Sequence, residues 1–536
     1  MMNHKLNQSK TCIDLYSGIG GWALGFKLCG VDIKQSFEWW SQASKTHDLN
    51  LLSNTTNCDI RELSHNNING PVDFIVGSPP CTQFSYSNRG GSGNVEDGLK
   101  DIKKFLEIVN HFKPKYWAME NVPRVANVIL VELSKGGSLE EFSSLCNSSM
   151  IKIYDFHEFG LPQKRKRCVV GNFNHVLLNS YKSKIKKKTL ENVISSLSST
   201  KVFDPNFLLT LSNNELTDKE KETSLNKEEE RYNKESKTHH PVYNNMEFPD
   251  PLNKPVRTIT ATCTRVSRES VIIKENENYR RLSVRERASC QGFPISYQFH
   301  GNSHSSKLKM IGNAIPPVFT YYLANAMLEI PCKKLVTLEK VKINCIDKNQ
   351  VPSHITSPDK EGKTYPLHRS FKFAIPNLRF KSGTRFELNN SKGKLPWKIE
   401  FFFGDSKRIL STKLDIKLFR EINKEINTRN SLFSKEVKNI IAKKMKKIDH
   451  NKLQLIWSNK DKGLHPFDLL DDLGFLAHQL IQKSKNIDND YFTGLIKKYV
   501  FVKSSSGKSI SENKLTSYAR EISIGLILGS AFNKIN

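Results

Sequence analysis

The sequence predicts an α/β protein built on a doubly wound, mostly parallel sheet, followed by a smaller region and an additional C-terminal α+β domain. In the first third of the chain, short apolar runs alternate with helical patterns, which is typical of parallel strands joined by crossover helices. The chain has 536 residues, enough for two to four domains. Hydrophobic residues make up 38% and charged residues 25%, as in an ordinary globular protein.

The elements of the sheet follow from the spacing of the apolar residues. We expect strands at 11–16, 34–38, 72–77, 115–120, 151–156 and 168–173. We expect the helices between these strands at 21–29, 42–52, 99–112 and 123–133. This alternation predicts helices on both faces of the sheet.

The rest of the chain is more varied. Residues 215–237 are dense in both charge signs, which predicts either a long polar helix or a mobile insertion. Further elements are expected as β structure at 255–273, helices at 281–293 and 317–328, a linker at 331–350, β structure at 371–403, and helices at 415–447 and beyond 453.

The positive charge is concentrated near the C-terminus. The net charge is +28, of which residues 1–332 contribute +8 and residues 333–536 contribute +20. Such an excess indicates a polyanionic partner, with nucleic acid favoured over a membrane surface. The alternative is a lysine-rich surface that serves only solubility.

Cysteine usage and hydropathy narrow the class of protein. The ten cysteines are scattered without a Cys-x-x-Cys pair, which argues against a disulfide framework and a structural zinc. No apolar run approaches the roughly 18 residues of a membrane helix, and residues 1–10 lack a secretory signal. We therefore expect a cytoplasmic protein that does not contact a membrane.

The first motif, Asp14–Gly21, lies between a predicted strand and a predicted helix. Its glycines allow a ligand to approach the backbone and the helix N-terminus. Glu38 follows Asp14 by 24 positions and ends the next strand, which is about the offset of a ribose-binding carboxylate. Trp39 could stack on an adenine, whereas the glycine pattern disfavours a nicotinamide cofactor. The alternative is a plain strand–turn–helix junction.

The second motif, Gly77–Ser85, contains Pro79, Pro80 and Cys81 directly after a predicted strand. The two prolines make the chain leave the strand in an extended path, which puts Cys81 on a loop at the carboxyl end of the sheet. A lone cysteine is more often a small core residue, but this polar loop does not have the pattern of a core.

The third motif, Met119–Pro123, places Glu120 at the end of another predicted strand. A carboxyl group in that position is suited to general acid catalysis at neutral pH. The alternative is that Asn121 caps a helix and that Glu120 is incidental.

The fourth motif, Gln163–Arg167, carries Arg165 and Arg167 on an extended segment, so that both point to the same side. They could bind an anion or a base carbonyl and would favour a nearby thiolate. The alternative is an exposed basic strand edge.

In this order, the four motifs resemble the cytosine-5 DNA methyltransferase family of the restriction-modification type. Residues 281–294 and 312–317 extend the resemblance, which covers roughly residues 11–330 and leaves a basic C-terminal extension unassigned. The resemblance implies a Rossmann-like fold that uses S-adenosyl-L-methionine as methyl donor, with no metal.

The resemblance also assigns roles to residues. The implied cofactor-binding residues are Tyr16, Ser17, Gly18, Ile19, Gly21, Glu38, Trp39, Asp59, Ile60, Leu99 and Asn313. The chain departs from the family pattern at Cys58, where Gly is usual, and at Lys309 or Met310, where the family often has one Gln.

The implied catalytic residues are Cys81, Glu120, Arg165 and Arg167. Cys81 would attack C6 of a cytosine flipped out of the duplex, Glu120 would hold N3 and the exocyclic amine, and Arg167 would contact O2. DNA-contacting candidates are Gln83, Ser85, Arg257, Arg265 and Arg268.

The domains expected on this basis are a cofactor-binding catalytic domain at 11–174, a target-recognition region at 175–280, the end of the core at 281–330, the linker at 331–350 and a basic, DNA-contacting accessory domain at 351–536. The expected partners are double-stranded DNA and a cognate restriction endonuclease as a functional partner. We expect a monomer in the bacterial cytoplasm, associated with the nucleoid through DNA.

Three alternatives stay open. The first is a tRNA cytosine-5 methyltransferase, which the roughly 100 residues between Asn172 and Arg281 disfavour. The second is a catalytically inactive DNA-binding regulator, which the intact set of catalytic residues disfavours. The third is a fusion to a C-terminal endonuclease, but only Asp415 and Lys417 hint at a nuclease metal site.

Overall fold

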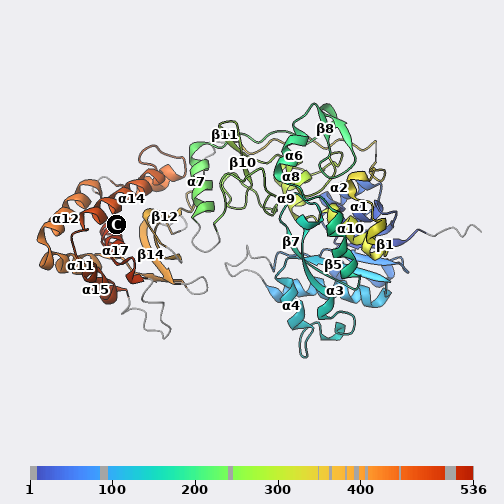
Figure 1. Ribbon diagram of the computed structural model, residues 1–536, viewed down its shortest axis with the longest axis horizontal. Coiled ribbons are helices and arrows are strands. Elements are labelled where there is room, and N and C mark those ends of the chain that lie inside the picture. The colour runs from blue at the N-terminus through green and yellow to red at the C-terminus, as the bar shows by residue number, and fades with distance from the viewer. Residues whose placement is uncertain are drawn as a thin grey trace, which may run out of the picture. The chain divides into compact units, whose positions relative to one another are not determined.

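The protein forms two compact units in a computed structural model (Figure 1). The structure describes residues 9–84, 94–239, 245–347, 349–360, 365–380, 383–391, 397–404, 409–445, 448–500 and 515–534. The first unit comprises Met1–Leu225 with Pro249–Asp359, and the second comprises Asn226–Phe248 with Lys360–Asn536. Among the described residues, no helix has the length and apolar character needed to cross a membrane.

A seven-stranded sheet forms the centre of the first unit. Its strands are β1 (Thr11–Leu15), β2 (Asp32–Glu38), β3 (Thr56–Asn57), β4 (Phe74–Gly77), β5 (Tyr116–Asn121), β6 (Ile151–Asp155) and β7 (Lys166–Gly171). They lie in the order β3-β2-β1-β4-β5-β7-β6. Strands β1 to β5 are parallel, and β7 is antiparallel to both of its neighbours. The mostly parallel sheet expected from the sequence is confirmed.

Helices cover both faces of this sheet, as Figure 1 shows. On one face lie α1 (Gly21–Lys27) and α10 (Pro317–Met327), whose Trp22 and Phe319 pack with Cys12 of β1. On the other face lie α3 (Val95–Phe112) and α4 (Val125–Glu132), whose Phe105 and Ile129 pack with Ile13. Neighbouring residues of a strand point to opposite faces, so both faces of β1 are buried and the doubly wound arrangement is confirmed.

The order of strands reverses at β1. The chain runs outward from β1 through β2 to β3, then returns to β4 on the other side of β1. In open sheets of this kind, ligands bind beyond the carboxyl ends of the strands at such a switch point. The loops that carry the first and second motifs, after Leu15 and Gly77, therefore begin at the expected place of a ligand site.

The rest of the first unit surrounds the sheet. Its further elements are α2 (Ser41–Leu51), α5 (His175–Ser180), α6 (Leu190–Leu197), β8 (Lys201–Phe203), β9 (Thr210–Ser212), β10 (Ile272–Glu275), β11 (Asn278–Arg281), α8 (Val284–Cys290) and α9 (His304–Asn313). The β structure expected at 255–273 is largely wrong, because only the bridge Gln163–Val256 and the start of β10 form there. The backbone of this segment bonds instead to side chains, as when Ile259 N donates to Gln163 Oε1.

The segment expected as a linker packs against the first unit. Leu335, Leu338 and Ile346 are all buried in the apolar clusters of that unit. The chain's last crossing between the two units therefore falls after Asp359.

The second unit contains an antiparallel four-stranded sheet, β12 (Lys372–Arg379), β13 (Arg385–Asn389), β14 (Lys398–Gly404) and β15 (Ile409–Thr412), in sequence order. Its helices are α11 (Ile416–Arg429), α12 (Ser431–Met445), α13 (His450–Trp457), α14 (Pro466–Lys483), α15 (Asn489–Tyr499) and α17 (Ala519–Phe532). Alternate residues such as Phe386, Phe401 and Phe403 share one apolar cluster with the helices. The additional α+β domain expected at the C-terminus is confirmed.

One helix of the second unit comes from the middle of the chain. The charged segment that the sequence left as a helix or an insertion forms α7 (Lys227–Thr238), which begins with a capping box between Asn226 and Glu229. The ring of Tyr232 lies 5.0 Å from that of Phe373 and stacks on Trp457 at 6.3 Å. The C-terminal domain is thus completed by a helix inserted from the expected target-recognition region.

Buried ion pairs also fix α7 within the second unit. Glu228 accepts hydrogen bonds from Arg369 at 2.7 Å and from His465 at 3.0 Å. Glu235 pairs with Arg379 at 2.8 Å. Because both glutamates lie in the helix and both arginines lie more than 130 residues later, the two segments stabilise one another.

We predict that Tyr232→Ala destabilises the second unit by about 2–3 kcal/mol, because it removes an aromatic ring packed on Phe373 and Trp457. Thermal unfolding together with hydrogen exchange of β12 and β13 measures the effect. Lys234→Ala, on the exposed side of the same helix, is the matched control and should change stability by less than about 0.5 kcal/mol. Equal behaviour of the two variants would show that α7 does not stabilise the domain.

Candidate active site

The glycine-rich loop after β1 has the backbone geometry of a ligand cradle. Tyr16 and Gly18 have φ of 54° and 55°, in the left-handed region. A Cβ added to Gly18 would meet no atom within 4 Å, so the loop faces open space there. A Cβ at Gly21 would lie 2.0 Å from the carbonyl oxygen of Ile315, so this glycine allows α1 to approach the segment before α10.

Glu38 joins the end of β2 to this loop. Its Oε2 accepts from Gly18 N at 2.8 Å, and its Oε1 accepts from Trp40 N at 2.9 Å. Burial raises the pKa of Glu38, and the backbone hydrogen bonds oppose that rise. The neighbouring Trp39 is 69% exposed, which is unusual for a tryptophan and leaves its ring accessible to a stacking partner.

The other expected cofactor residues gather around the same loop. The amide of Cys58 donates to the carbonyl of Glu38, which brings Asp59 beside the end of β2. Ile60 and Leu99 are buried in one apolar cluster with Tyr16 packed against it. The buried Ser17 and Ile19 form the floor of the loop, where Tyr297 Oη donates to the carbonyl of Ile19 at 2.6 Å.

Asn313 approaches this loop from the other side of the sequence. It is exposed at the end of α9, two residues before Ile315, whose carbonyl touches Gly21. All eleven residues expected at the cofactor pocket are therefore either in the glycine-rich loop or next to a segment that contacts it.

The loop that carries Cys81 is held to two elements of the sheet. Trp22 Nε1 of α1 donates to Ser78 Oγ at 2.9 Å. Asn121 Nδ2 at the end of β5 donates to the carbonyl of Pro79 at 3.0 Å. These two bonds fix the extended Pro-Pro segment, so the position of Cys81 follows from β4 and β5 together.

Three charged side chains lie close enough to the Cys81 thiol to shift its pKa. Arg167 Nε lies 2.9 Å from Glu120 Oε1, and both side chains are largely buried. Burial raises the pKa of Cys81, the charges of Arg167 and Arg165 lower it, and Glu120 raises it. The thiol, the carboxylate and the guanidinium of Arg167 thus form one cluster where β4 and β5 end and β7 begins.

Arg165 stabilises this cluster from within the protein. It is 2% exposed and donates to the carbonyls of Ile259, Gly312 and Ala314 at 3.1, 3.3 and 3.2 Å. Burial lowers the pKa of its guanidinium. Because the carbonyls come from two segments distant in sequence, Arg165 joins the start of β7 to both of those segments.

Of the two candidate DNA-contacting residues that follow Cys81, the structure describes one. Gln83 is half-buried, and its Oε1 accepts from Asn94 N at 2.8 Å. Ser85 lies outside the described residues.

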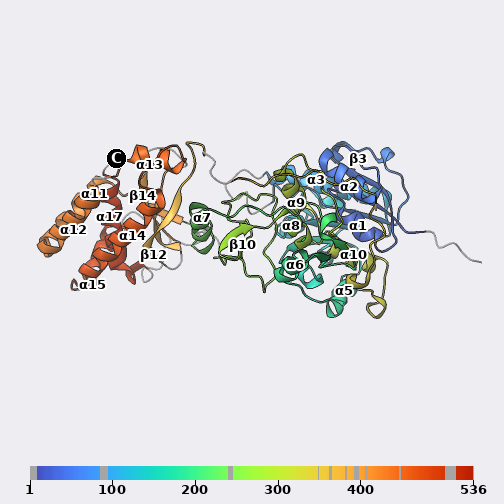
Figure 2. The ribbon, with the colours of Figure 1, turned by 90° about the horizontal axis from the view of Figure 1, so that it is seen from above.

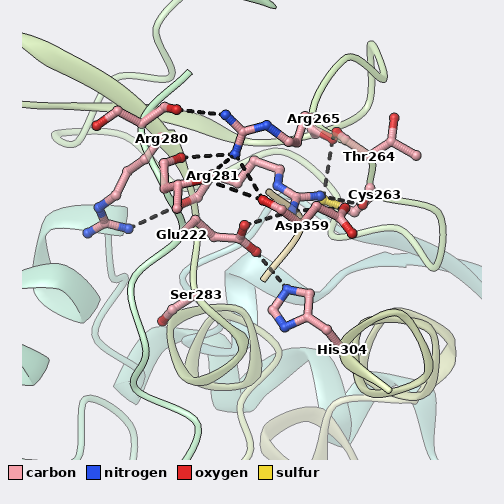
Figure 3. Close-up of polar contacts among 12 residues, drawn as sticks. Glu222, Cys263, Thr264, Arg265, Arg280, Arg281, Ser283, His304 and Asp359 are labelled. Carbon is pink, nitrogen blue, oxygen red and sulfur yellow. Dashed lines mark hydrogen bonds and ion pairs between the residues drawn. The ribbon is translucent and has the colours of Figure 1, made fainter. Parts of the chain in front are cut away.

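The three arginines expected to read DNA bases are all engaged inside the first unit. Arg257 pairs with Asp250, and Arg268 pairs with Glu269 at 3.1 Å. Arg265 is 6% exposed and donates to Thr223 and to the carbonyl of Ser224 (Figure 3). In this structure the Arg265 guanidinium is an internal donor rather than a group displayed on the surface.

Arg265 belongs to a buried network of side chains, some of which lie just before the points where the chain passes into the second unit (Figure 3). Arg281 donates to Glu222 at 2.7 Å and to Asp359 at 3.2 Å, and His304 bonds to Glu222 at 2.7 Å. Burial alone would raise the pKa of Glu222, but His304 and Arg281 outweigh it and hold that pKa below its ordinary value. Glu222 and Asp359 each lie just before a crossing into the second unit.

A comparison with known families identifies the family of the chain. The sequence model described as C-5 cytosine-specific DNA methylase matches residues 10–329. The chain belongs to this family. The resemblance inferred from the motifs is therefore confirmed, and the protein is a DNA cytosine-5 methyltransferase.

Curated relatives of the methyltransferase align with about three fifths of the chain. Type II methyltransferase M.FnuDI of Fusobacterium nucleatum is 26% identical over 358 residues, which are 62% of this chain and 96% of that protein. Type II methyltransferase M.HindV of Haemophilus influenzae is 28% identical over 328 residues, which are 59% and 96%.

Solved structures also align with the methyltransferase. The Entamoeba histolytica methyltransferase EhMeth is 14% identical with a TM-score of 0.43, and covers 60% of this chain and 99% of its own. The S. pombe Dnmt2 methyltransferase is 16% identical with a TM-score of 0.42, and covers 60% and 98%.

Some residues of the methyltransferase site were not singled out from the sequence. Buried Gln163 donates to Gln291 Oε1 at 2.6 Å, and Gln291 donates to the carbonyl of Ala314 at 2.8 Å. Lys164 and Lys166 alternate with the arginines and are exposed. The alternation along this extended segment could have predicted that the lysines are exposed. The two glutamines lie 128 residues apart, so no local pattern could have predicted their contact.

The described part of the methyltransferase contains no group of three or more His, Cys, Asp or Glu side chains that could hold a metal ion.

We predict that the rate of Cys81 alkylation rises with a midpoint above pH 9.0, the ordinary value, because burial disfavours the thiolate. Arg167→Ala should move this midpoint higher, since it removes the positive charge that favours the thiolate. Mass spectrometry of the alkylated peptide over a pH series measures both values. Lys166→Ala, on the exposed side of the same strand, is the control, and an unshifted midpoint in Arg167→Ala would contradict the assignment.

Proposed function

We propose that the protein transfers a methyl group from S-adenosyl-L-methionine to C5 of a flipped cytosine in a short duplex DNA sequence, through a covalent bond from Cys81 to C6. The observation that carries this proposal is the cluster of Cys81, Glu120 and Arg167 at the carboxyl edge of the sheet. The glycine-rich loop begins at the same edge, which supports a cofactor beside the nucleophile.

The residues around the loop suit S-adenosyl-L-methionine. Open space above Gly18 leaves room for a ligand on the backbone, and the exposed Trp39 offers a face for an adenine. Glu38 would hold the ribose hydroxyls, with Asp59 and Asn313 at the rim of the pocket. The bound cofactor supplies an electrophilic methyl group on a sulfonium.

The protein's own residues then activate the cytosine. C5 is a poor nucleophile until the Cys81 thiolate adds to C6 and turns the ring into an enamine. Glu120 would donate to N3 and accept from the exocyclic amine, which makes C6 electrophilic. Arg167 would contact O2, and its charge favours the Cys81 thiolate against the cost of burial.

The cycle closes when the covalent bond breaks. After C5 has gained the methyl group, it loses its proton to water, and the electrons of the C5–H bond form the C5–C6 double bond as the Cys81 thiolate departs. The thiolate is thus regenerated and methylated cytosine is released. Because the duplex hides C5 and C6 within its stack, the base must leave the helix first, and Gln83 or Ser85, which follow the nucleophile in sequence, would fill the gap.

The biological role proposed for this activity is protection of DNA in a restriction-modification system. The curated relatives M.FnuDI and M.HindV carry the name type II methyltransferase. A cognate endonuclease is then a functional partner that cleaves the same sequence when it is unmethylated.

The competing functions make different predictions. A tRNA methyltransferase would modify tRNA in preference to duplex DNA, and a DNA-binding regulator would transfer no methyl group. A C-terminal endonuclease would cleave DNA in the presence of Mg²⁺. Parallel assays of one preparation with duplex DNA and tRNA, each with and without Mg²⁺, distinguish all three.

We predict that Cys81→Ser lowers the rate of methyl transfer by a factor of about 10⁴ or more and leaves DNA binding intact. Bisulfite sequencing of duplex DNA incubated with the protein and S-adenosyl-L-methionine maps the modified cytosine and its sequence context. Cys332→Ser, a substitution outside the site, should behave as the wild type. Full activity in Cys81→Ser would refute the role of this residue.

A further inference from the structure

The second unit has an exposed basic face on two neighbouring helices. We define this basic face as Lys417, Arg420 and Lys424 of α11 together with Lys435 and Lys438 of α12, all of which are exposed. The two helices lie side by side in both views (Figures 1 and 2). The unit as a whole has 39 Lys and Arg against 22 Asp and Glu, a net charge of +17.

Helical spacing places these cations opposite the core. Lys417, Arg420 and Lys424 are separated by three and four residues and therefore share one side of α11. Leu418, Ile422 and Ile426 occupy the opposite side and are buried in the apolar cluster of the unit. On α12, Lys435 and Lys438 likewise lie opposite the buried Phe433, Val437 and Ile441.

The cations of the basic face are not neutralised within the described part of the chain. Nearby carboxylates pair with other lysines, since Glu425 pairs with Lys498 and Glu436 pairs with Lys483. Among the described side chains, none of the five cations of the basic face has an ion-pair partner. Glu421 is the exposed carboxylate on the same side of α11.

We propose that the basic face binds the phosphate backbone of duplex DNA. Because the proposed substrate of the first unit is duplex DNA, this inference rests on the proposed function and adds a second contact to the same molecule. Lys417 to Lys424 span about 10 Å of helix axis, comparable with about three base-pair steps of DNA. Lysines and arginines in such a row bind phosphates without reading sequence.

A membrane surface fits the basic face less well. An amphipathic helix binds a membrane by inserting its apolar side below the headgroups. The apolar sides of α11 and α12 are already used in the core of the second unit. The basic face therefore offers charge without an apolar side to insert.

The chain path gives this contact a role in target recognition. The segment Asn226–Phe248 leaves the first unit after Leu225 and returns at Pro249, within the expected target-recognition region. A third crossing joins Asp359 to Lys360. DNA held by the basic face is thus kept at a high effective concentration near the part of the chain that selects the target.

The test is the salt dependence of DNA affinity for the full-length triple variant Lys417→Ala, Arg420→Ala, Lys424→Ala, measured on duplex DNA without methyl donor. Each phosphate contact contributes about 0.9 to the magnitude of the slope of log binding constant against log salt concentration. The magnitude of the slope should therefore decrease by about 2–3. The matched control is Lys460→Ala, Lys462→Ala, Lys485→Ala, which removes the same charge from exposed turns of the same unit.

Each outcome decides the proposal. A smaller slope in the α11 variant alone supports it, whereas an unchanged slope, or an equal fall in the control, overturns it. Loss of tRNA or anionic-vesicle binding with unchanged DNA binding also overturns it. If thermal unfolding shows that the triple variant is not folded, Lys435→Ala, Lys438→Ala on α12 replaces it, with an expected fall of about 1–2.

The same variants separate this inference from the proposed function. The binding measurement needs neither cofactor nor methyl transfer, so it stands even if the wild type does not methylate cytosine. If the wild type does methylate DNA, the triple variant should retain kcat and show a raised KM for DNA at physiological salt.

Discussion

The site depends on one constraint of the sheet, which is that β1, β4 and β5 run in the same direction and end at the same edge. Three loops therefore meet there, carrying the glycine-rich motif, Cys81 and Glu120. Strand β7 runs the opposite way, so its start brings Arg167, and Arg165 directly before it, to that same edge. The directions of the strands alone therefore bring together residues that are far apart in sequence.

Burial and the arginine charges of the cluster shift the pKa of Cys81 in opposite directions. Burial disfavours the thiolate of Cys81, and two guanidinium groups oppose that effect. Arg167 is directly paired with Glu120, whereas Arg165 donates only to backbone carbonyls of the protein. The two arginines therefore differ in their contacts: Arg167 pairs with a carboxylate of the cluster, and Arg165 joins backbone segments of the protein.

Local patterns predicted most of this architecture. The apolar runs located the strands of the central sheet, and the first three motifs lie where β1, β4 and β5 end, as expected. The segment 255–273 was misjudged, since its Thr, Val and Ile residues are typical of strands but its backbone bonds to side chains such as Gln163. Partners that distant in sequence leave no periodic signal.

The insertion of α7 into the C-terminal domain was also beyond local reasoning. Its charge pattern left a helix and a mobile insertion open, and its partners Arg369 and Arg379 lie more than 130 residues later. The burial of Arg265 was also missed, because an arginine in an irregular loop is most often exposed. Two of the three crossings between the units, after Leu225 and after Phe248, lie within the region expected to recognise the target.

The central claim is the transient bond between Cys81 and C6 of cytosine. It is tested most directly by incubating the full-length protein and S-adenosyl-L-methionine with a long duplex in which 5-fluorocytosine replaces cytosine. Fluorine at C5 cannot leave as the proton does, so the account predicts a denaturation-resistant protein–DNA complex whose linked peptide contains Cys81. Absence of a complex on DNA that the protein methylates in its unfluorinated form, or linkage through another side chain, would contradict it.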